Sequence, residues 1–379
     1  MAFDYLASGR TDEYWYDMVG INDLKVIGRL NGVTGGQITW DYDSDLKVSG
    51  RLDVADAKFV NNCLIRVWLG SRMPTDKKTT WVELCTCFAS TEQGHYENGK
   101  YSGTIQLRGV LARFADDVLE CDYTHAKGAS VLGRYRSMFR WLGGKYTWEG
   151  LEDTTFSKTK VFEFGSSAME PMQHIADCVG GQLTCDTHGY VVLKNYVSPS
   201  KRPCVYRVKA DGTSVTLAGV DESYTLAGTT NRYAVRHRYN WKYEDSEGKT
   251  KTIERTIYGL AESKSTWSTA YQKVGRYVTE TWDRDTISTK IADNTSTAVR
   301  DASEAIAKKE LNELAARWLN TAATTYRYYT FRTCTYLPFM IGDVIGFQYD
   351  KINVEGIVTR IDYDLKPGCP MTVEIRKVR

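Results

Sequence analysis

Alternating hydrophobic and polar positions dominate the C-terminal part of the chain. Over residues 326–331, aromatic and β-branched side chains alternate in direction with a period of two, which favours a strand over a helix. Leu337-Pro338 interrupts the pattern, because proline cannot donate a hydrogen bond to a sheet, and residues 341–343 supply a turn. Further strands are predicted over residues 344–349, 354–363 and 371–378. Together they predict a short antiparallel meander that closes a sheet.

The N-terminal part shows the same alternation. Apolar residues alternate with polar ones from Leu46 to Val54, and the aspartate-rich segment 41–45 before them predicts a turn. Leu111, Phe114 and Val118 are spaced for one side of a helix over residues 110–119. Strands between these two segments are predicted over residues 64–69, 81–88 and 101–107. This first region is therefore predicted to be rich in β-structure.

A small α/β unit is predicted further along the chain. Ser167-Ala-Met-Glu170 has the form of a capping box, in which the Ser hydroxyl and the Glu carboxylate bind free amides at the start of a helix. The helix is expected to end at Gly180-Gly181, because glycine accepts the left-handed conformation found at helix ends. A hairpin over residues 182–197 should follow, with its turn at residues 187–189. The residues expected on the buried face of the helix are Met172, Ile175, Ala176 and Val179.

A second strand-rich region is followed by one long amphipathic helix over residues 296–319. Asp293 and Ser296 are among several candidate N-caps, and Glu304 lies four residues before Lys308 in the order that favours an ion pair. The strands before the helix are predicted over residues 215–220, 231–241 and 251–258. The apolar stripe of the helix consists of Val299, Ala302, Ile306, Leu311, Leu314 and Trp318. A carboxylate in this stripe, as in Leu314→Glu, is expected to destabilise the fold.

Length, charge and cysteine content limit the classes of protein. A chain of 379 residues predicts two to four domains of about 100–200 residues each. The 49 Lys and Arg against 47 Asp and Glu give a net charge of +2, which offers no electrostatic case for nucleic acid or an anionic membrane. There is no apolar run of about 18 residues and no basic-then-apolar N-terminus, so we expect cytoplasmic synthesis without Sec export. Nine scattered cysteines predict free, mostly buried thiols.

Two pairs of metal-ligand residues lie close together in the sequence. His174 and Cys178 are four residues apart on the predicted helix, and Cys185 and His188 are three apart at the hairpin, which outlines a two-cysteine, two-histidine zinc site. The helix would have to lie over the hairpin to bring them together, and His188 belongs to the turn itself. Buried thiols and a solvated histidine are the preferred interpretation. No metal site and no cofactor are therefore predicted.

An aspartate motif imitates a calcium-binding loop. Asp41, Asp43 and Asp45 match its opening positions, but Leu46 stands where glycine is needed and Leu52 where a bidentate glutamate belongs. A hairpin turn is the better interpretation.

Other chemical motifs are incomplete. Residues 94–100 nearly match a phosphate-binding loop, but Tyr101 replaces the Ser or Thr that would hold magnesium, and a strand follows where a helix is needed. The chain contains neither a Gly-x-Ser-x-Gly elbow nor a His-Glu-x-x-His motif. Its paired carboxylates, such as Glu152-Asp153, are interpreted as solvated surface. No catalytic residue is predicted, and we expect the protein not to be an enzyme.

The order of elements resembles a known family. The capped helix leads to the hairpin over residues 182–193, then to Asn231-Arg-Tyr-Ala-Val-Arg236, the long Ala-rich helix, and residues 341–344 followed by 361–368. This order is similar to that of the tail hub proteins of tailed bacteriophages, which include the baseplate hub of contractile phages and the N-terminal part of siphophage tail-associated lysins. The resemblance covers residues 19–378.

The resemblance implies an α+β, β-dominated fold class with two β-barrel domains, smaller α/β insertions and one long amphipathic helix. The first barrel is expected over residues 1–155 and the small α/β unit over residues 156–200. Residues 201–290 and 325–379 are expected to form the second barrel, on which the helix region 291–324 packs.

The resemblance also implies a structural role. A hub of this family is a minor tail protein of the virion or of a phage-derived tail, and forms a homotrimer whose barrels make a ring that caps the tail tube. Its implied partners are the tail tube or distal tail protein ring, the tape-measure protein and tip or fibre proteins, with genome DNA only in transit and no stable membrane segment. The implied location is the virion tail tip, after assembly in the host bacterial cytoplasm. The chain stops at Arg379 after the last predicted strand, so we expect no lysin domain.

Aromatic enrichment leaves one alternative of a different class. The chain has 25 tyrosines and 10 tryptophans, which suit both contact surfaces and sugar stacking. A carbohydrate-binding or carbohydrate-active β protein could use Trp141, Trp148, Trp241 and Trp267. The long helix and the inserted α/β unit count against this alternative.

Overall fold

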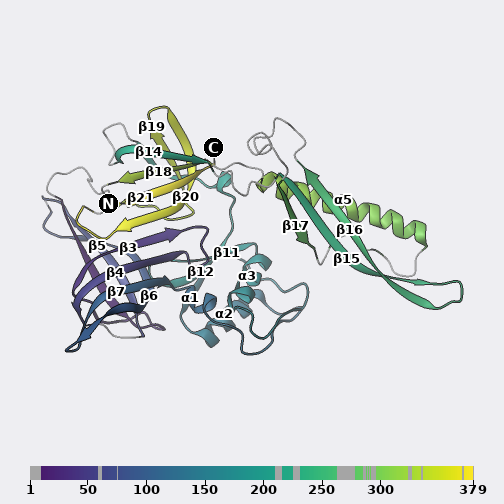
Figure 1. The fold of residues 1–379 in the computed structure, drawn as a ribbon, viewed down its shortest axis with the longest axis horizontal. Helices are drawn as coiled ribbons and strands as arrows, with labels where there is room; N and C mark the ends of the chain where they lie inside the picture. The colour runs from purple at the N-terminus through teal and green to yellow at the C-terminus, as the bar shows by residue number, and fades with distance from the viewer. Residues whose placement is uncertain are drawn as a thin grey trace. The chain divides into compact units, whose positions relative to one another are not determined.

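The computed structural model consists of two compact units (Figure 1). Unit 1 comprises Met1–Asp221 and Tyr329–Arg379, and unit 2 comprises Glu222–Tyr328. Strands far outnumber helices, so the predicted β-dominated α+β class is confirmed. The residues that the structure describes are 10–58, 62–74, 76–209, 216–224, 231–262, 278–284, 287, 289, 291, 296–322, 327–333, 336–368 and 371–378.

Unit 1 is built on one large sheet. Its main path runs β14-β18-β21-β20-β3-β4-β7-β6-β5-β1-β2, with β19 between β20 and β13. The buried faces of these strands carry fully buried side chains such as Trp40, Phe347 and Tyr363. The strands are β1 Thr11–Val19, β2 Val26–Arg29, β3 Val33–Asp41, β4 Val48–Ala57, β5 Leu64–Arg72, β6 Thr80–Glu97, β7 Lys100–Gly109, β13 Cys204–Lys209, β14 Thr216–Tyr224, β18 Arg327–Thr333, β19 Val344–Tyr349, β20 Ile352–Asp364 and β21 Met371–Lys377.

The N-terminal and C-terminal halves of this sheet meet at β20. Its residues 352–357 pair with β19, and its residues 360–364 pair with β3, while β21 occupies the opposite edge. The register of β20 shifts between Val358 and Arg360, and the Tyr42 amide donates to the Thr359 carbonyl where the partner changes. One long strand therefore joins segments that are more than 300 residues apart in the sequence.

The strands of residues 201–290 and 325–379, which are expected to form the second barrel, are divided between two sheets. Among the described strands, β13, β14 and β18–β21 belong to the large sheet, whereas β15, β16 and β17 pair only with one another. β15 and β16 satisfy each other's backbone hydrogen bonds along thirteen residue pairs. β20, in contrast, is long enough to extend to β3 and pair with it. The expected barrel closures and domain limits stay predictions.

The α/β elements of unit 1 begin earlier than residue 156. α2 was not predicted, and β9 pairs in parallel with β12 of the hairpin. The predicted hairpin itself is confirmed as β11 and β12. The bounds are α1 Ala112–Ala115, β8 Tyr123–His125, α2 Val131–Leu142, β9 Lys145–Glu149, β10 Lys160–Phe162, α3 Met169–Cys178, β11 Gly181–Cys185, β12 Tyr190–Asn195 and the 3-10 turn η1 Pro199–Lys201.

The helix predicted over residues 110–119 is shorter in the structure. Leu111 and Phe114 are buried as expected, but α1 ends at Ala115 and Val118 is exposed. Val118 instead forms an isolated antiparallel β-bridge with Ser167. The local pattern thus predicted the buried side of the first turn but not its end.

The start of α3 also differs from prediction. The Ser167 hydroxyl accepts from the Met169 amide rather than from Glu170, so the expected capping box does not form. The buried face is confirmed for Met172, Ile175 and Ala176. Gly180 follows the helix with a φ of 62°, the left-handed conformation that glycine adopts without strain.

Unit 2 is a three-stranded sheet with one helix packed on it. β15 Arg232–Glu244 lies between β16 Thr250–Glu262 and β17 Thr279–Asp283, and α5 Thr297–Ala322 covers one face. Alternate residues of β15 are buried, which leaves the opposite face open. The core consists of Tyr233, Val235, Ile257, Ala307, Leu311, Ala315 and Leu319.

The long helix is confirmed, but its predicted stripe is wrong in the first half. Val299 and Ile306 are 51% and 62% exposed, and Ala302 is also exposed. Leu311 is buried, Leu314 is half-buried against the core, and the side chain of Trp318 lies outside the described residues. Small residues, Ala307 and Ala315, face the sheet instead, because they let the helix backbone approach it closely.

None of the helices described here has the length and apolar character needed to span a membrane.

Candidate functional site

The four residues of the zinc-like motif fall into two separate places. On α3, the Cys178 Sγ lies 3.6 Å from the His174 Nε2, as their four-residue spacing predicts. The other ring nitrogen of His174 lies 2.9 Å from the Nδ1 of His125, at the end of β8. His125 was not among the candidates, because it is 49 residues away in the sequence.

Cys185 and His188 have other partners. Cys185 is buried at the end of β11, and burial raises the pKa of its thiol. The His188 Nδ1 lies 2.6 Å from a carboxylate oxygen of Glu83 in β6, while most of the His188 ring is exposed. The described residues contain no group of three or more His, Cys, Asp or Glu placed to hold a metal ion.

Glu83 is the centre of a polar cluster that fixes the turn of the β11–β12 hairpin. Its buried carboxylate forms an ion pair with Arg66, whose Nε lies 3.0 Å away, and accepts from the Thr86 hydroxyl at 2.9 Å, in addition to its contact with His188. Burial raises the pKa of Glu83, although these three partners act in the opposite direction. Gly189 in the turn has a φ of 88°, and its backbone packs against Thr86. The cluster therefore ties the α/β elements to β5 and β6.

The calcium-like segment is a turn, as expected. The Asp41 carboxylate accepts from the backbone amides of Asp43 and Ser44 at 2.9 and 3.2 Å. The Lys47 ammonium donates to the carbonyl of Tyr42 in the same turn. Asp41 is thus used to hold the turn in the manner of an Asx turn.

The phosphate-loop-like segment is the β6–β7 hairpin. Asn98 and Gly99 both have positive φ at its tip, which is the backbone of a two-residue hairpin turn. Lys100 begins β7, so a strand follows the loop, as predicted.

The tryptophans of the carbohydrate alternative do not share one surface. Trp141 of α2 is 44% exposed and stacks over Tyr123, whereas Trp148 of β9 is half-buried. Trp241 of unit 2 is buried beneath Arg300. Trp267 lies outside the described residues.

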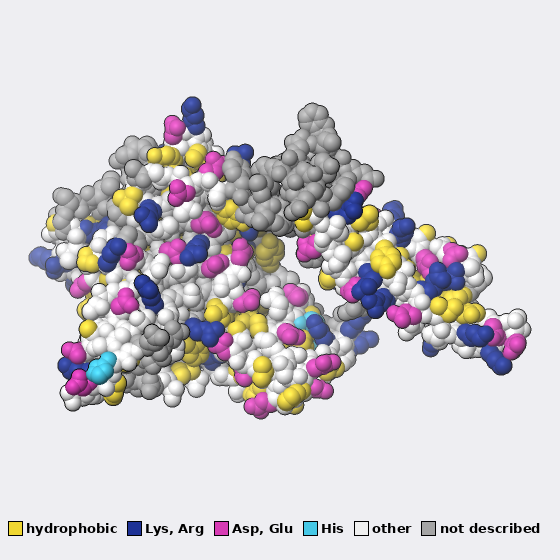
Figure 2. Space-filling model, in the orientation of Figure 1, with side chains coloured by type: hydrophobic (Ala, Val, Ile, Leu, Met, Phe, Trp, Pro, Cys, Tyr) yellow, Lys and Arg dark blue, Asp and Glu magenta, His cyan; other side chains and the backbone are white. Residues whose placement is uncertain are grey.

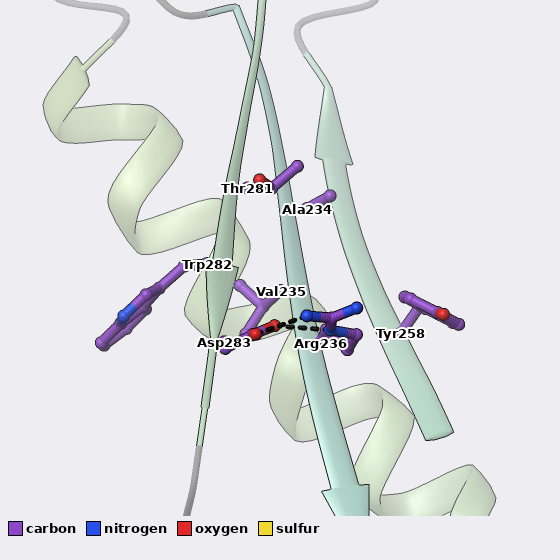
Figure 3. A pocket seen from close by; sticks show the side chains of 7 residues that line it. All are labelled: Ala234, Val235, Arg236, Tyr258, Thr281, Trp282 and Asp283. Atoms are coloured by element: carbon purple, nitrogen blue, oxygen red, sulfur yellow. Dashed lines mark hydrogen bonds and ion pairs between the residues drawn. The ribbon is translucent and has the colours of Figure 1, made fainter. Parts of the chain in front are cut away.

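The open face of the unit 2 sheet carries a hollow of about 340 Å³. Ala234 of β15 and Thr281 of β17 are paired neighbours with small side chains, which leaves the space (Figure 3). Arg236 donates two hydrogen bonds to Asp283 at the edge of this space, and these bonds lower the pKa of Asp283. Tyr258 of β16 lines the hollow on the side of Arg236 that faces away from Asp283. The lining residues are Ala234, Val235, Arg236, Tyr258, Thr281, Trp282 and Asp283.

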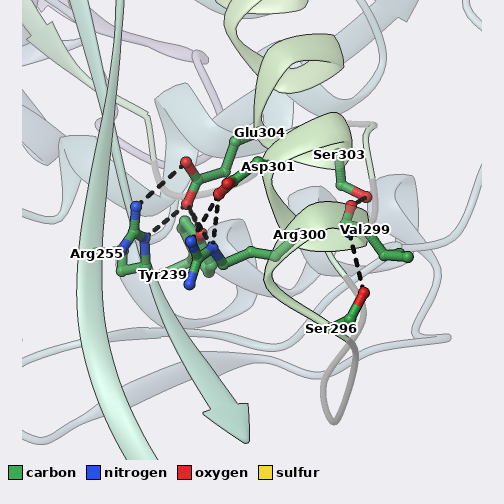
Figure 4. Close-up of polar contacts among 8 residues, drawn as sticks. All are labelled: Tyr239, Arg255, Ser296, Val299, Arg300, Asp301, Ser303 and Glu304. Atoms are coloured by element: carbon green, nitrogen blue, oxygen red, sulfur yellow. Dashed lines mark hydrogen bonds and ion pairs between the residues drawn. The ribbon is translucent and has the colours of Figure 1, made fainter.

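The covered face of the same sheet is held to α5 by a polar cluster (Figure 4). Glu304 of α5 accepts from Tyr239 and from the Arg255 Nε, the latter at 2.6 Å. Burial alone would raise the pKa of Glu304, but the hydrogen bonds from Arg255 and Tyr239 outweigh it and lower the pKa. Glu304 therefore bonds to the sheet instead of serving only as the predicted partner of Lys308. Arg300, one turn earlier, stacks on Trp241.

The exposed surface of unit 2 mixes apolar and charged side chains (Figure 2). Tyr258 and Leu260 are 58% and 49% exposed on the open sheet face, and Val299 and Ile306 are exposed on α5. Tyrosine and arginine beside apolar side chains are the residue types that dominate protein interfaces. Sequence reasoning missed this surface, although the alternation in residues 251–258 was a signal that one face of β16 is open.

Comparison with solved structures defines the class of fold. A tail protein from Neisseria meningitidis MC58 aligns over 96% of this chain and 96% of its own, with a TM-score of 0.58 and 12% identity. The 43 kDa tail protein of prophage MuSo2 from Shewanella oneidensis aligns over 97% of this chain and 98% of its own, with a TM-score of 0.56 and 12% identity. No protein-family model and no curated protein sequence matches the chain. The chain has the fold of these phage-type tail proteins, so the resemblance inferred from its sequence is confirmed at the level of the fold.

Proposed function

We propose that the chain is a structural hub subunit of a bacteriophage tail or a phage-derived tail. Three copies form a ring that caps the tail tube and organises the tail tip for assembly and DNA delivery. The subunit acts through its surfaces and not through a catalytic site. Its partners are further copies of itself, the tail tube or distal tail protein ring, the tape-measure protein and tip or fibre proteins. It works at the virion tail tip after assembly in the host cytoplasm.

The observation that carries this proposal is the extent of the shared fold. Both tail proteins align over at least 96% of this chain and of themselves, so the likeness includes both units and the α/β elements. A likeness confined to one sheet would have little functional value, because a fold hosts many functions. Here the whole order of elements is shared.

We assign the open face of the unit 2 sheet to a contact between copies. Tyr258 and Leu260 project from β16 beside the Arg236–Asp283 pair, so an apolar anchor of a neighbouring copy could fill the hollow while the charged pair borders it. A cyclic trimer requires a surface of this kind on each copy.

Native mass spectrometry of the full chain, alone and with the tail tube protein, tests the assembly. A trimer of about 129 kDa is expected from three chains of 42.9 kDa each. The double variant Tyr258→Ala, Leu260→Asp should lose the trimer and keep the monomer fold, while Thr252→Ala on the same strand should assemble normally. A chain that stays monomeric under all these conditions would overturn the proposal, and a monomer that binds glycan would favour the carbohydrate alternative.

Localisation gives an independent test. Particles from a host that carries the gene, labelled through this chain, should show the label at one end of the tail. Label on the capsid or along the tail shaft would contradict the hub position.

A further inference from the structure

Two histidines of unit 1 form a buried contact that the proposed function does not use. The Nδ1 atoms of His125 and His174 are 2.9 Å apart, and His125 is fully buried. His125 stacks on Phe156 at a ring distance of 4.5 Å, and Phe162 lies edge-on to both histidines. The contact joins the end of β8 to the middle of α3.

Only one arrangement of protons suits this contact. Two nitrogens at this distance need one N–H between them, so one ring donates and the other accepts. The Nε2 of His125 is buried without a hydrogen-bond partner, and a bare acceptor there costs less than an N–H group. His125 therefore donates from Nδ1 to the Nδ1 of His174. This leaves the remaining proton of His174 on Nε2, directed at the Cys178 sulfur 3.6 Å away.

An additional proton from water has no good place in this arrangement. If His174 takes it, two N–H groups face each other at 2.9 Å. If the proton between the rings is instead donated by His174, His125 must carry its own proton on the buried Nε2, where no acceptor is available. Every protonated state therefore weakens the contact or buries an unpartnered N–H.

The charges around the pair also oppose protonation. Lys160 of β10 is the strand partner of His125, and Arg134 of α2 also repels a positive charge on it. Asp177 of α3 favours a charge on His174 but lies on the more exposed side, next to Cys178. Burial, followed by the repulsion of His174, Arg134 and Lys160, lowers the pKa of His125 to about 3. Burial and Lys160 lower the pKa of His174 as well.

We propose that the His125–His174 pair is a proton-sensitive latch that holds α3 against β8 and β10 while both rings are neutral. Acid opens the latch, because the two histidines bind protons readily in the opened state and poorly in the closed state. A histidine in the opened state titrates near its ordinary pKa of about 6.5, so the closed state is favoured fully above that pH and loses stability as the pH falls below it. The latch is independent of the hub function.

Hydrogen exchange of the full chain tests the latch. Between pH 7.5 and pH 5.0, after correction for intrinsic exchange rates, the opening of α3 should increase by about thirtyfold for each histidine that stays neutral when closed. Amides of α2 should change much less and serve as an internal reference. The variant His174→Gln, which cannot titrate, should lose most of this pH dependence, whereas His95→Gln at the exposed β6–β7 hairpin should retain it.

A second measurement does not depend on the folding of any variant. The chain has five histidines, so ¹⁵N-histidine labelling of the wild-type protein can follow each ring through the titration. Two rings should remain neutral below pH 5.5, until the opening transition itself. A ring titration of His125 or His174 at or above pH 6.5, or equal pH dependence of α3 opening in wild type and His174→Gln, would overturn the proposal.

Discussion

Gly259 of β16 lies directly against the backbone of Leu311 in α5. A Cβ atom at residue 259 would be 2.4 Å from the Leu311 carbonyl carbon and 2.5 Å from its Cβ. The neighbouring Leu260 amide donates to the Asn312 side chain at 2.8 Å, so the helix is both close to the strand and hydrogen-bonded to it. The glycine at position 259 is therefore required for the packing of unit 2.

Gly259→Ala should push α5 away from the sheet. The new methyl group would meet backbone atoms, which cannot move without shifting the whole helix, so we expect a loss of about 1–3 kcal/mol in the stability of unit 2. Chemical denaturation with hydrogen exchange of α5 measures it. Gly35→Ala in β3 is the matched control, because an added Cβ there would lie 4.0 Å from its nearest neighbour, the Asp53 carboxylate. Equal stability of the two variants would contradict this packing.

Leu311 and Ile306 should differ sharply on truncation. Leu311 is fully buried in the core of unit 2, so Leu311→Ala should cost about 2–5 kcal/mol. Ile306 is 62% exposed on the same helix, and Ile306→Ala should cost less than about 0.5 kcal/mol. The denaturation midpoints of the two variants measure this difference in stability. The midpoint of Leu314→Glu, at a half-buried position, should fall between them. A larger cost at Ile306 would restore the stripe predicted from the sequence.

Local patterning predicted the elements of this chain better than their partners. β21 covers Met371–Lys377 of the predicted residues 371–378, because alternation reports which residues of one strand are buried. Which side of α5 faces the sheet depends on Gly259, which lies 52 residues before Leu311 in the sequence. The periodicity of the helix alone cannot indicate that side. For the same reason Val299 and Ile306 are exposed, although the predicted stripe included them. Packing between distant segments decided the outcome.

The candidate sites show the same limit. The spacing of His174 and Cys178 correctly placed both on one face of α3. Their actual environment comes from His125, and His188 meets Glu83 from a strand 105 residues away. Neither contact has a local signal in the sequence, since strand pairing and helix docking bring these residues together.

Removal of the Glu83 carboxylate should destabilise unit 1. The side chain of Glu83 is 4% exposed and forms an ion pair with Arg66, so Glu83→Ala leaves the half-buried Arg66 guanidinium without its carboxylate and should cost about 1–3 kcal/mol. Glu97→Ala at the far end of the same strand removes an exposed pair with His95 and should cost less than about 0.5 kcal/mol. Comparison of their urea midpoints is the test. Similar midpoints would mean that the cluster does not anchor the hairpin.

The reactivity of the cysteines should follow their burial. All seven described cysteines are free, and Cys121 and Cys178 are exposed, whereas Cys63, Cys85, Cys87 and Cys185 are buried. Burial raises the pKa of Cys63 to about 11 and raises that of Cys185 as well, so these thiols contain little reactive thiolate at neutral pH.

Alkylation at neutral pH, mapped by mass spectrometry, should therefore modify Cys121 first. Cys178 should follow more slowly, because burial and the neighbouring Asp177 raise the pKa of its thiol. Cys63 and Cys185 should react only at the rate at which the chain unfolds, and denaturant should make all of them react alike. Rapid labelling of Cys185 in the native chain would contradict its placement between the α/β elements and β6, because its thiol is buried there beside Cys87.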